Sequence, residues 1–142
     1  NPDDADANGS YLVEVQVSDG ALIGSQTIAV GLTDANDAPV ITGGGAVSVA
    51  ENTAGAVATV TATDPDIGQG RTFSITGGAD AALFTINGST GELSFVAAPD
   101  FEAPADAGGD NVYDVTVTVT DTGNPALSDD QAFAVTVTDV TD

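Results

Sequence analysis

Cysteine, methionine, histidine and tryptophan are all missing from the 142 residues of this sequence. The lack of cysteine excludes disulfides and thiol chemistry, and the lack of histidine removes a common zinc ligand and the side chain that titrates near neutral pH. No apolar run reaches the roughly 18 residues that a transmembrane helix requires. We therefore expect no direct insertion into a membrane and no imidazole or thiolate chemistry.

Basic side chains are almost missing as well. Arg71 is the single cation against 22 Asp and Glu residues, which gives a formal net charge of −21. Such a surface repels nucleic acid, because binding phosphate requires Lys and Arg, so no nucleic-acid partner is expected. Three explanations of the acidity stay open at this point: intrinsic disorder, solubilising charge suited to a salty habitat, and carboxylate ligands for a hard cation such as Ca²⁺.

Apolar and polar residues alternate with a period of two along most of the chain. In the segment 112–120, for example, Tyr113, Val115, Val117 and Val119 share one face. Clusters of Gly, Asn, Asp and Pro separate such segments, as in an all-β sandwich, and this regularity counts against disorder. The predicted strands are 11–17, 27–32, 46–50, 56–62, 71–75, 83–86, 92–96, 112–120 and 131–138.

The sequence also repeats itself. Residues 11–20 resemble 113–123 with an offset of 102, and residues 26–37 resemble 131–142 with an offset of 105. A period near 100 residues is typical of tandem β-sandwich domains. We therefore predict that residues 1–37 are the C-terminal strand pair and linker of a preceding repeat, and that residues 38–142 form a complete repeat.

The acidic segments follow one another in an order that resembles the cadherin repeat. The family's linker D-x-N-D-x-x-P resembles residues 34–39, with one residue fewer before the proline, and its early glutamate is matched by Glu51. D-x-D-x-G-x-N resembles residues 64–70, where Gly70 replaces the usual asparagine. T-G-x-[IL] followed by L-D-x-E resembles 90–93 and 99–102, and A-x-D-x-G-x-P-x-L-S matches from Asp121 to Ser128. The sequence is thus similar to bacterial cadherin-like repeats of large surface or secreted adhesins.

This resemblance implies a Greek-key, cadherin-like (immunoglobulin-like) β-sandwich with Ca²⁺ bound between consecutive repeats. Carboxylates, amide oxygens and backbone carbonyls are the ligands that Ca²⁺ prefers. The implied ligands of the upper junction are Asp34, Asn36, Asp37, Asp64, Asp66, Asp121 and the Gly70 carbonyl. The implied ligands of the lower junction are Glu51, Asp100, Glu102, Asp139 and Asp142. The remaining loop acids, including Asp80 and Asp106, are expected to be solvated charge.

The function that follows is a calcium-rigidified structural and adhesion module of a multi-repeat extracellular protein, with neighbouring repeats as its partners. The alternative is a module that binds a carbohydrate or protein ligand on a bacterial surface. Sugar sites usually present an exposed aromatic ring, and Tyr113 lies on a face that we expect to be buried. Acid pairs such as Asp64 and Asp66 occur in hydrolases, but a domain of about 100 residues has little room for a deep cleft. We therefore expect that this protein is not an enzyme.

Overall fold

The chain divides into two compact units, unit 1 at Asn1–Ala35 and unit 2 at Asn36–Asp142. The structure is a computed structural model and describes residues 10–141. The expected ligand Asp142 lies outside the described residues. Within residues 10–141, no helix is long and apolar enough to cross a bilayer.

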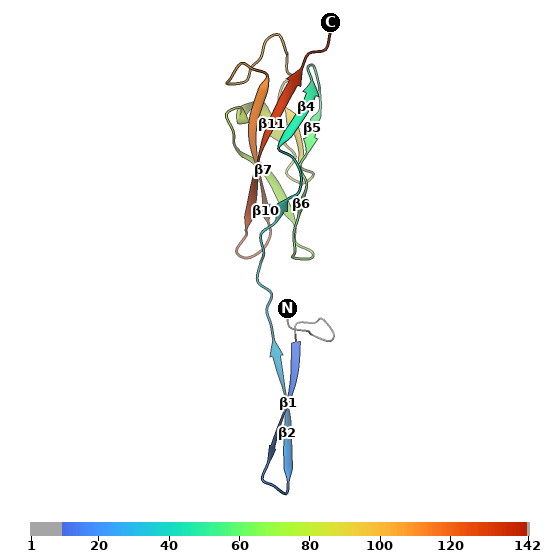
Figure 1. Ribbon diagram of the computed structural model, residues 1–142, viewed down its shortest axis with the longest axis vertical. Coiled ribbons are helices and arrows are strands. Elements are labelled where there is room, and N and C mark those ends of the chain that lie inside the picture. Colours follow the sequence, from blue (N-terminus) through green and yellow to red (C-terminus); the bar gives the residue numbers. More distant parts are fainter. Residues whose placement is uncertain (1–9, 142) are drawn as a thin grey trace. The chain divides into compact units, whose positions relative to one another are not determined.

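Unit 1 is an antiparallel hairpin of two strands, β1 (Ser10–Ser18) and β2 (Ile23–Gly31) (Figure 1). Asp19 closes the turn by accepting hydrogen bonds from the N–H groups of Ala21 and Leu22, both at 2.9 Å. Tyr11 pairs with Val30 and Val13 with Ile28, so one face of the hairpin is largely apolar. On this face Val13, Ile28 and Val30 are 46–47% exposed in the described part of the chain.

The larger sheet of unit 2 has four strands in the order β4–β11–β10–β7. The long strands β10 (Val112–Asp121) and β11 (Ser128–Thr138) pair antiparallel at its centre. β7 (Arg71–Gly77) runs antiparallel to β10, whereas β4 (Ala46–Ala50) runs parallel to β11. The predicted strands in these four regions are confirmed.

A second sheet, in the order β5–β9–β8, faces the first. It contains β5 (Ala56–Thr59), β9 (Glu92–Phe95) and β8 (Phe84–Ile86), and a 3₁₀ turn, η1 (Ala81–Leu83), precedes β8. The predicted strand 56–62 is wrong as one element. After Thr59 the Val60 N–H bonds to Gly91 O, and the chain then leaves this sheet to form β6 (Ala62–Thr63), which pairs with β3 (Val40–Ile41).

The core lies between the two sheets. Tyr113, Val115, Val117 and Val119 of β10 are at most 1% exposed, as the alternating pattern predicts. Leu93 of β9 is fully buried against them. Burying each Val or Leu contributes about 1.5–3 kcal/mol, so this cluster is the main source of stability. Unit 2 is thus the predicted all-β, immunoglobulin-like sandwich.

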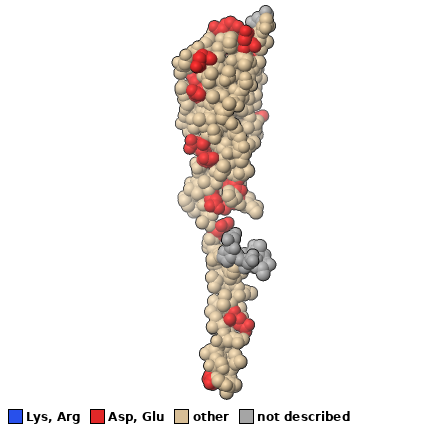
Figure 2. Space-filling model, in the orientation of Figure 1, with Lys and Arg blue, Asp and Glu red and all other residues tan. Residues whose placement is uncertain are grey.

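The chain enters and leaves unit 2 at opposite ends of the sandwich. The chain enters at the end that carries the β10–β11 loop, here called the entry end, and it leaves at the opposite exit end after β11 (Figure 1). At the entry end Asn36 Nδ2 donates to Pro125 O, and at the exit end Val140 N donates to Glu51. Figure 2 shows acidic side chains scattered over the face in view, with no basic side chain visible among them.

Candidate functional site

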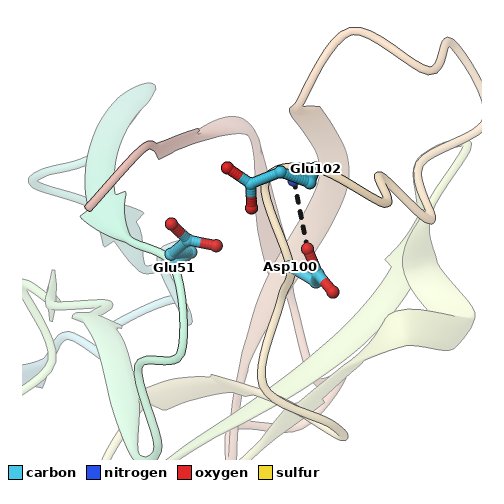
Figure 3. Close-up of side chains that lie close together, drawn as sticks. All are labelled: Glu51, Asp100 and Glu102. Carbon is cyan, nitrogen blue, oxygen red and sulfur yellow. Dashed lines mark hydrogen bonds between the residues drawn. The ribbon is translucent and has the colours of Figure 1, made fainter. Parts of the chain in front are cut away.

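Three carboxyl groups meet at the exit end of unit 2. One ligand oxygen from each of Glu51, Asp100 and Glu102 lies within 4.8 Å of the other two (Figure 3). Within residues 10–141, no other group of three or more acidic side chains comes this close together. Glu51 follows β4 directly, whereas Asp100 and Glu102 belong to the loop between β9 and β10. Two segments distant in sequence therefore build the cluster.

Backbone N–H groups fix Glu51 in this cluster. Glu51 is only 5% exposed, and its two carboxylate oxygens accept from Val140 N at 2.9 Å and from Phe101 N at 3.0 Å. These hydrogen bonds outweigh burial and lower the pKa of Glu51. Glu51 is therefore a fixed negative charge, bound both to the loop that carries Asp100 and to the segment that leaves the domain.

A turn orients the other two acids. Asp100 Oδ1 accepts from the N–H groups of Glu102 and Ala103, both at 3.1 Å, which is the geometry of an Asx turn. Figure 3 shows the carboxyl groups of Glu51 and Glu102 facing each other. A hydrogen bond from its own N–H lowers the pKa of Glu102, but burial and the charges of Glu51 and Asp139 outweigh it and raise the pKa. The exit end thus concentrates the negative charges of three carboxyl groups.

At the entry end, Asp121 ends strand β10 and is 4% exposed. Its Oδ1 accepts from Gly123 N at 2.9 Å and Leu127 N at 3.0 Å, and its Oδ2 accepts from Asn36 Nδ2 at 3.0 Å. Burial raises the pKa of Asp121, but these hydrogen bonds more than offset it, so the pKa lies below its ordinary value. Asp121 is therefore a buried carboxylate that stays ionised and accepts a hydrogen bond from the linker residue Asn36.

The D-x-D segment lies beside the same linker. Asp66 Oδ2 accepts from Asp37 N at 2.8 Å, and Asp64 Oδ1 accepts from Asp66 N at 2.9 Å. The other Asp64 oxygen, Oδ2, is buried and has no hydrogen-bond partner. A buried anionic oxygen without a donor is costly, and a cation would satisfy it. Gly70 ends this segment, where its N–H donates to Thr122 Oγ1 at 3.0 Å.

The sequence did not indicate Gln69 as part of this site. Its Nε2 donates to Asn36 Oδ1 at 2.6 Å, and its Oε1 is buried without a partner. Of the three such orphaned side-chain atoms in the described part of the chain, two belong to the segment 64–70. The only signal in the sequence was that Gln69 stands next to Gly70, where the family motif has an amide side chain.

Asp34 is the one expected entry-end ligand that belongs to unit 1, and its side chain is exposed. The entry-end acids that the structure describes do not form a group of three with ligand atoms within 4.8 Å, in contrast to the exit-end cluster. Two of these entry-end acids are instead hydrogen-bonded to the linker, Asp121 to Asn36 Nδ2 and Asp66 to Asp37 N.

The expectation of solvated charge is wrong for Asp80 and Asp106, which are 4% and 7% exposed. Asp80 accepts from Ala107 N at 2.7 Å and Asp114 N at 2.8 Å, and Asp106 accepts from Asp110 N at 3.0 Å and Asn111 N at 3.1 Å. These carboxylates satisfy the backbone of the loop before β10. Their role is structural, and no periodicity in the sequence indicates it.

Comparison with known proteins identifies the family. A family model described as the cadherin domain matches residues 46–138. Human cadherin EGF LAG seven-pass G-type receptor 2 is 32% identical over 105 residues, which cover 68% of this chain and 4% of that protein. Protocadherin Fat 2 of Rattus norvegicus is 32% identical over 148 residues, which cover 98% of this chain and 3% of that protein. The chain thus spans a small part of these relatives.

A prokaryotic relative and a solved structure agree with this assignment. Halomucin of Haloquadratum walsbyi is 42% identical over 86 residues, covering 54% of this chain and 1% of that protein. It is archaeal, whereas the sequence pattern suggested a bacterial relative. The extracellular cadherin domains 1–5 of Protocadherin Gamma B2 align with a TM-score of 0.77 at 28% identity, covering 98% of this chain and 28% of that chain. The chain belongs to the cadherin domain family.

Proposed function

We propose that unit 2 is a calcium-binding structural and adhesion module of a multi-repeat extracellular protein. The observation that carries this proposal is the exit-end cluster, in which oxygens of Glu51, Asp100 and Glu102 lie within 4.8 Å of one another. Ca²⁺ takes six to eight oxygen ligands at about 2.3–2.6 Å, so oxygens that share one ion lie within about 5 Å of each other. When bound, Ca²⁺ supplies the positive charge that balances these carboxylates.

The residues of both ends fit such a cation. At the exit end, a backbone hydrogen bond lowers the pKa of Glu102, but burial and repulsion from Glu51 and Asp139 outweigh it and raise the pKa, and a cation would relieve the repulsion. At the entry end, the buried Asp64 Oδ2 lacks a donor. We propose Asp34, Asn36, Asp37, Asp64, Asp66, Asp121 and the Gly70 carbonyl as entry-end ligands, and Glu51, Asp100, Glu102, Asp139 and Asp142 as exit-end ligands.

The hairpin of unit 1 supports the proposal that residues 1–37 belong to another copy of the same sandwich. Its pairs Tyr11–Val30 and Val13–Ile28 have the register of Tyr113–Val135 and Val115–Phe133 in β10 and β11. The offsets of 102 and 105 residues relate both strands. On this proposal, residues 38–142 are one full repeat, and neighbouring repeats of the same protein are the partners that complete each calcium site.

The mechanism is electrostatic. Without a cation, the clustered carboxylates repel one another across a junction and the linker samples many conformations. Bound Ca²⁺ cancels this repulsion and ties residues of both repeats to one ion, which stiffens a tandem array. Extracellular modules bind Ca²⁺ with a Kd of roughly 10⁻⁴–10⁻³ M. An ion present at ten times its Kd adds only about 1.4 kcal/mol of stability. Several junctions are therefore needed for a stiff array.

The alternative of a carbohydrate-binding module gains little support from the aromatic residues. Tyr113, Phe73, Phe84 and Phe133 are buried in the core of unit 2. The other aromatic side chains are half-buried, namely Tyr11, Phe95 and Phe101. Phe95 packs against Phe84 and Tyr113 with ring centroids 4.5 and 5.0 Å apart. We therefore favour the structural role, without catalysis, and leave a protein ligand as the remaining alternative.

Isothermal titration of the chain with CaCl₂ tests the proposed function. We expect saturable binding that survives matched ionic strength in NaCl, since general screening acts equally on every surface charge. Asp66→Ala and Glu51→Gln should each remove part of the binding, whereas Glu92→Gln, at an exposed carboxylate that is not among the proposed ligands, should leave it intact. Binding that is absent, or unchanged in both Asp66→Ala and Glu51→Gln, would refute the proposal.

A further inference from the structure

We propose that Gln69 contributes its side-chain oxygen Oε1 as an additional ligand of the entry-end cation site. This inference rests on the proposed calcium binding and assigns a ligand that the family motif does not contain. The motif has an asparagine at the position of Gly70, and Gln69 immediately precedes this position.

The orientation of Asn36 is fixed by its acceptors. Its Nδ2 lies 3.0 Å from Asp121 Oδ2 and 2.9 Å from Pro125 O, and neither of these oxygens carries a proton to donate. The amide nitrogen of Asn36 must therefore face them, and Oδ1 must face the other way. A carbonyl oxygen accepts only, so the group that lies 2.6 Å from Oδ1 must be the Gln69 nitrogen, Nε2.

The orientation of Gln69 follows. Because Nε2 is held by Asn36, the other terminal atom of Gln69 is Oε1, and this atom is buried without a hydrogen-bond partner. An amide exchange of Gln69 would leave two carbonyl oxygens in contact, so it does not resolve the missing donor. Asp64 Oδ2, five residues earlier, is orphaned in the same way. Two buried oxygens of the segment between β6 and β7 therefore lack a donor, and one of them belongs to a carboxylate. A cation would satisfy both, whereas another acceptor would satisfy neither.

Packing holds this arrangement in place. Gly123 lies so close to Asn36 that a Cβ atom at position 123 would overlap the Asn36 amide. Asp121, Asn36 and Gln69 thus form a continuous chain of hydrogen bonds from the end of β10 to the β6–β7 connection. Gln69 Oε1 is therefore preorganised, and binding a cation there would require little reordering.

Titration of Gln69→Leu with CaCl₂ tests this assignment. We expect the entry-end Kd to rise by about 3- to 30-fold through loss of one oxygen ligand. Gln16→Leu, an exposed residue of unit 1, is the matched control and should bind as the wild type does. Both variants are to be made in the Glu51→Gln background, so that the entry-end site is read separately from the exit-end cluster.

A double-mutant cycle separates a ligand from a residue that only positions Asn36. If Gln69 were merely positioning Asn36, Gln69→Leu would add nothing to Asn36→Ala. If Gln69 is a ligand, the double variant binds more weakly than Asn36→Ala alone. Gln69→Glu sharpens the test, because it keeps an oxygen but cannot donate to Asn36. It should bind Ca²⁺ at least tenfold more tightly, by about 1.4 kcal/mol, than Gln69→Leu.

Luminescence of bound Eu³⁺ gives an independent readout. Its lifetimes in H₂O and D₂O count the waters on the ion, and Gln69→Leu should add about one water in place of the lost ligand. An unchanged water count with wild-type affinity would overturn the role of Gln69 and mean that solvent satisfies Oε1. Failure of the wild type itself to bind Ca²⁺ would instead overturn the proposed function.

Discussion

Asn36 Nδ2 donates to Asp121 Oδ2 over 3.0 Å, although 85 residues separate the two in sequence. This bond attaches the segment that enters unit 2 to the end of its central strand β10. It satisfies one oxygen of a carboxylate that is 4% exposed. The same two residues are proposed calcium ligands, so a hydrogen bond holds these two ligands together without a cation.

Asn36→Ala should therefore destabilise unit 2 even in EDTA. The substitution leaves Asp121 Oδ2 and Pro125 O without their donor, and we expect the thermal midpoint to fall by about 5 °C, as for loss of one ordinary hydrogen bond. Circular dichroism at 218 nm or scanning calorimetry measures this shift. Asp130→Ala, at an exposed position of β11, serves as control; an equal effect in both variants would contradict the role of the Asn36–Asp121 bond.

Glu51→Gln should reduce the stabilisation by Ca²⁺ more than the stability in EDTA. Glutamine retains an oxygen for one of the two N–H donors, Val140 and Phe101, but carries no charge for a cation. If both ends bind, roughly half of the calcium-induced rise in midpoint should be lost. The comparison is Glu92→Gln, which removes the same charge from an exposed site; a full rise in Glu51→Gln would exclude the exit-end cluster.

The internal repeat provides a matched pair of core substitutions. Val117 is fully buried in β10, whereas its counterpart in the hairpin, Val15, is 50% exposed. Val117→Ala should cost about 1.5–4 kcal/mol of unfolding free energy through the cavity it leaves, and Val15→Ala less than about 0.5 kcal/mol. Urea denaturation followed by circular dichroism measures both. Comparable costs would mean that the hairpin face is covered in solution.

The stability that Asp106 contributes in EDTA should be lost at acidic pH. Burial raises the pKa of Asp106, but hydrogen bonds from the N–H groups of Asp110 and Asn111 outweigh it, so the folded-state pKa is lowered. Its contribution is therefore complete above the unfolded pKa of about 3.9 and is lost as the pH falls through the folded value. Asp106→Asn should be less stable than the wild type at pH 6, and this difference should shrink below about pH 4.

Asp130→Asn is the control for that pH series, because its side chain is exposed. The stability curve of this variant should run parallel to that of the wild type. A gap between wild type and Asp106→Asn that stays constant from pH 6 to pH 3 would show that packing, not the charge of Asp106, carries the effect.

The strands were predictable from sequence where one face is buried. Val115, Val117 and Val119 alternate with threonines because only one face of β10 packs in the core. The β3 and β6 strands escaped notice because two residues are too few to show a period. Residues 56–62 read as one strand because alternation continues through Val60, where the chain changes sheets.

The acidic motifs located both ends of the sandwich, but not the way each end is held together. Glu51, Asp100 and Glu102 were grouped by their motif order, and the structure brings them within 4.8 Å. The sequence did not indicate Gln69, because its contact with the entry end is a hydrogen bond to Asn36, a linker residue 33 positions away. Asp80 and Asp106 looked like surface charge because their partners are backbone N–H groups, which every residue except proline carries.

Thermal unfolding of the wild-type chain in EDTA, in millimolar CaCl₂ and in NaCl of equal ionic strength tests the central claim most directly. Specific binding predicts a midpoint that rises with Ca²⁺ concentration and stays near the EDTA value in NaCl. If NaCl raised the midpoint as far as CaCl₂ does, the acidic side chains would be general surface charge that any salt screens. That result would contradict calcium binding at both ends of the sandwich.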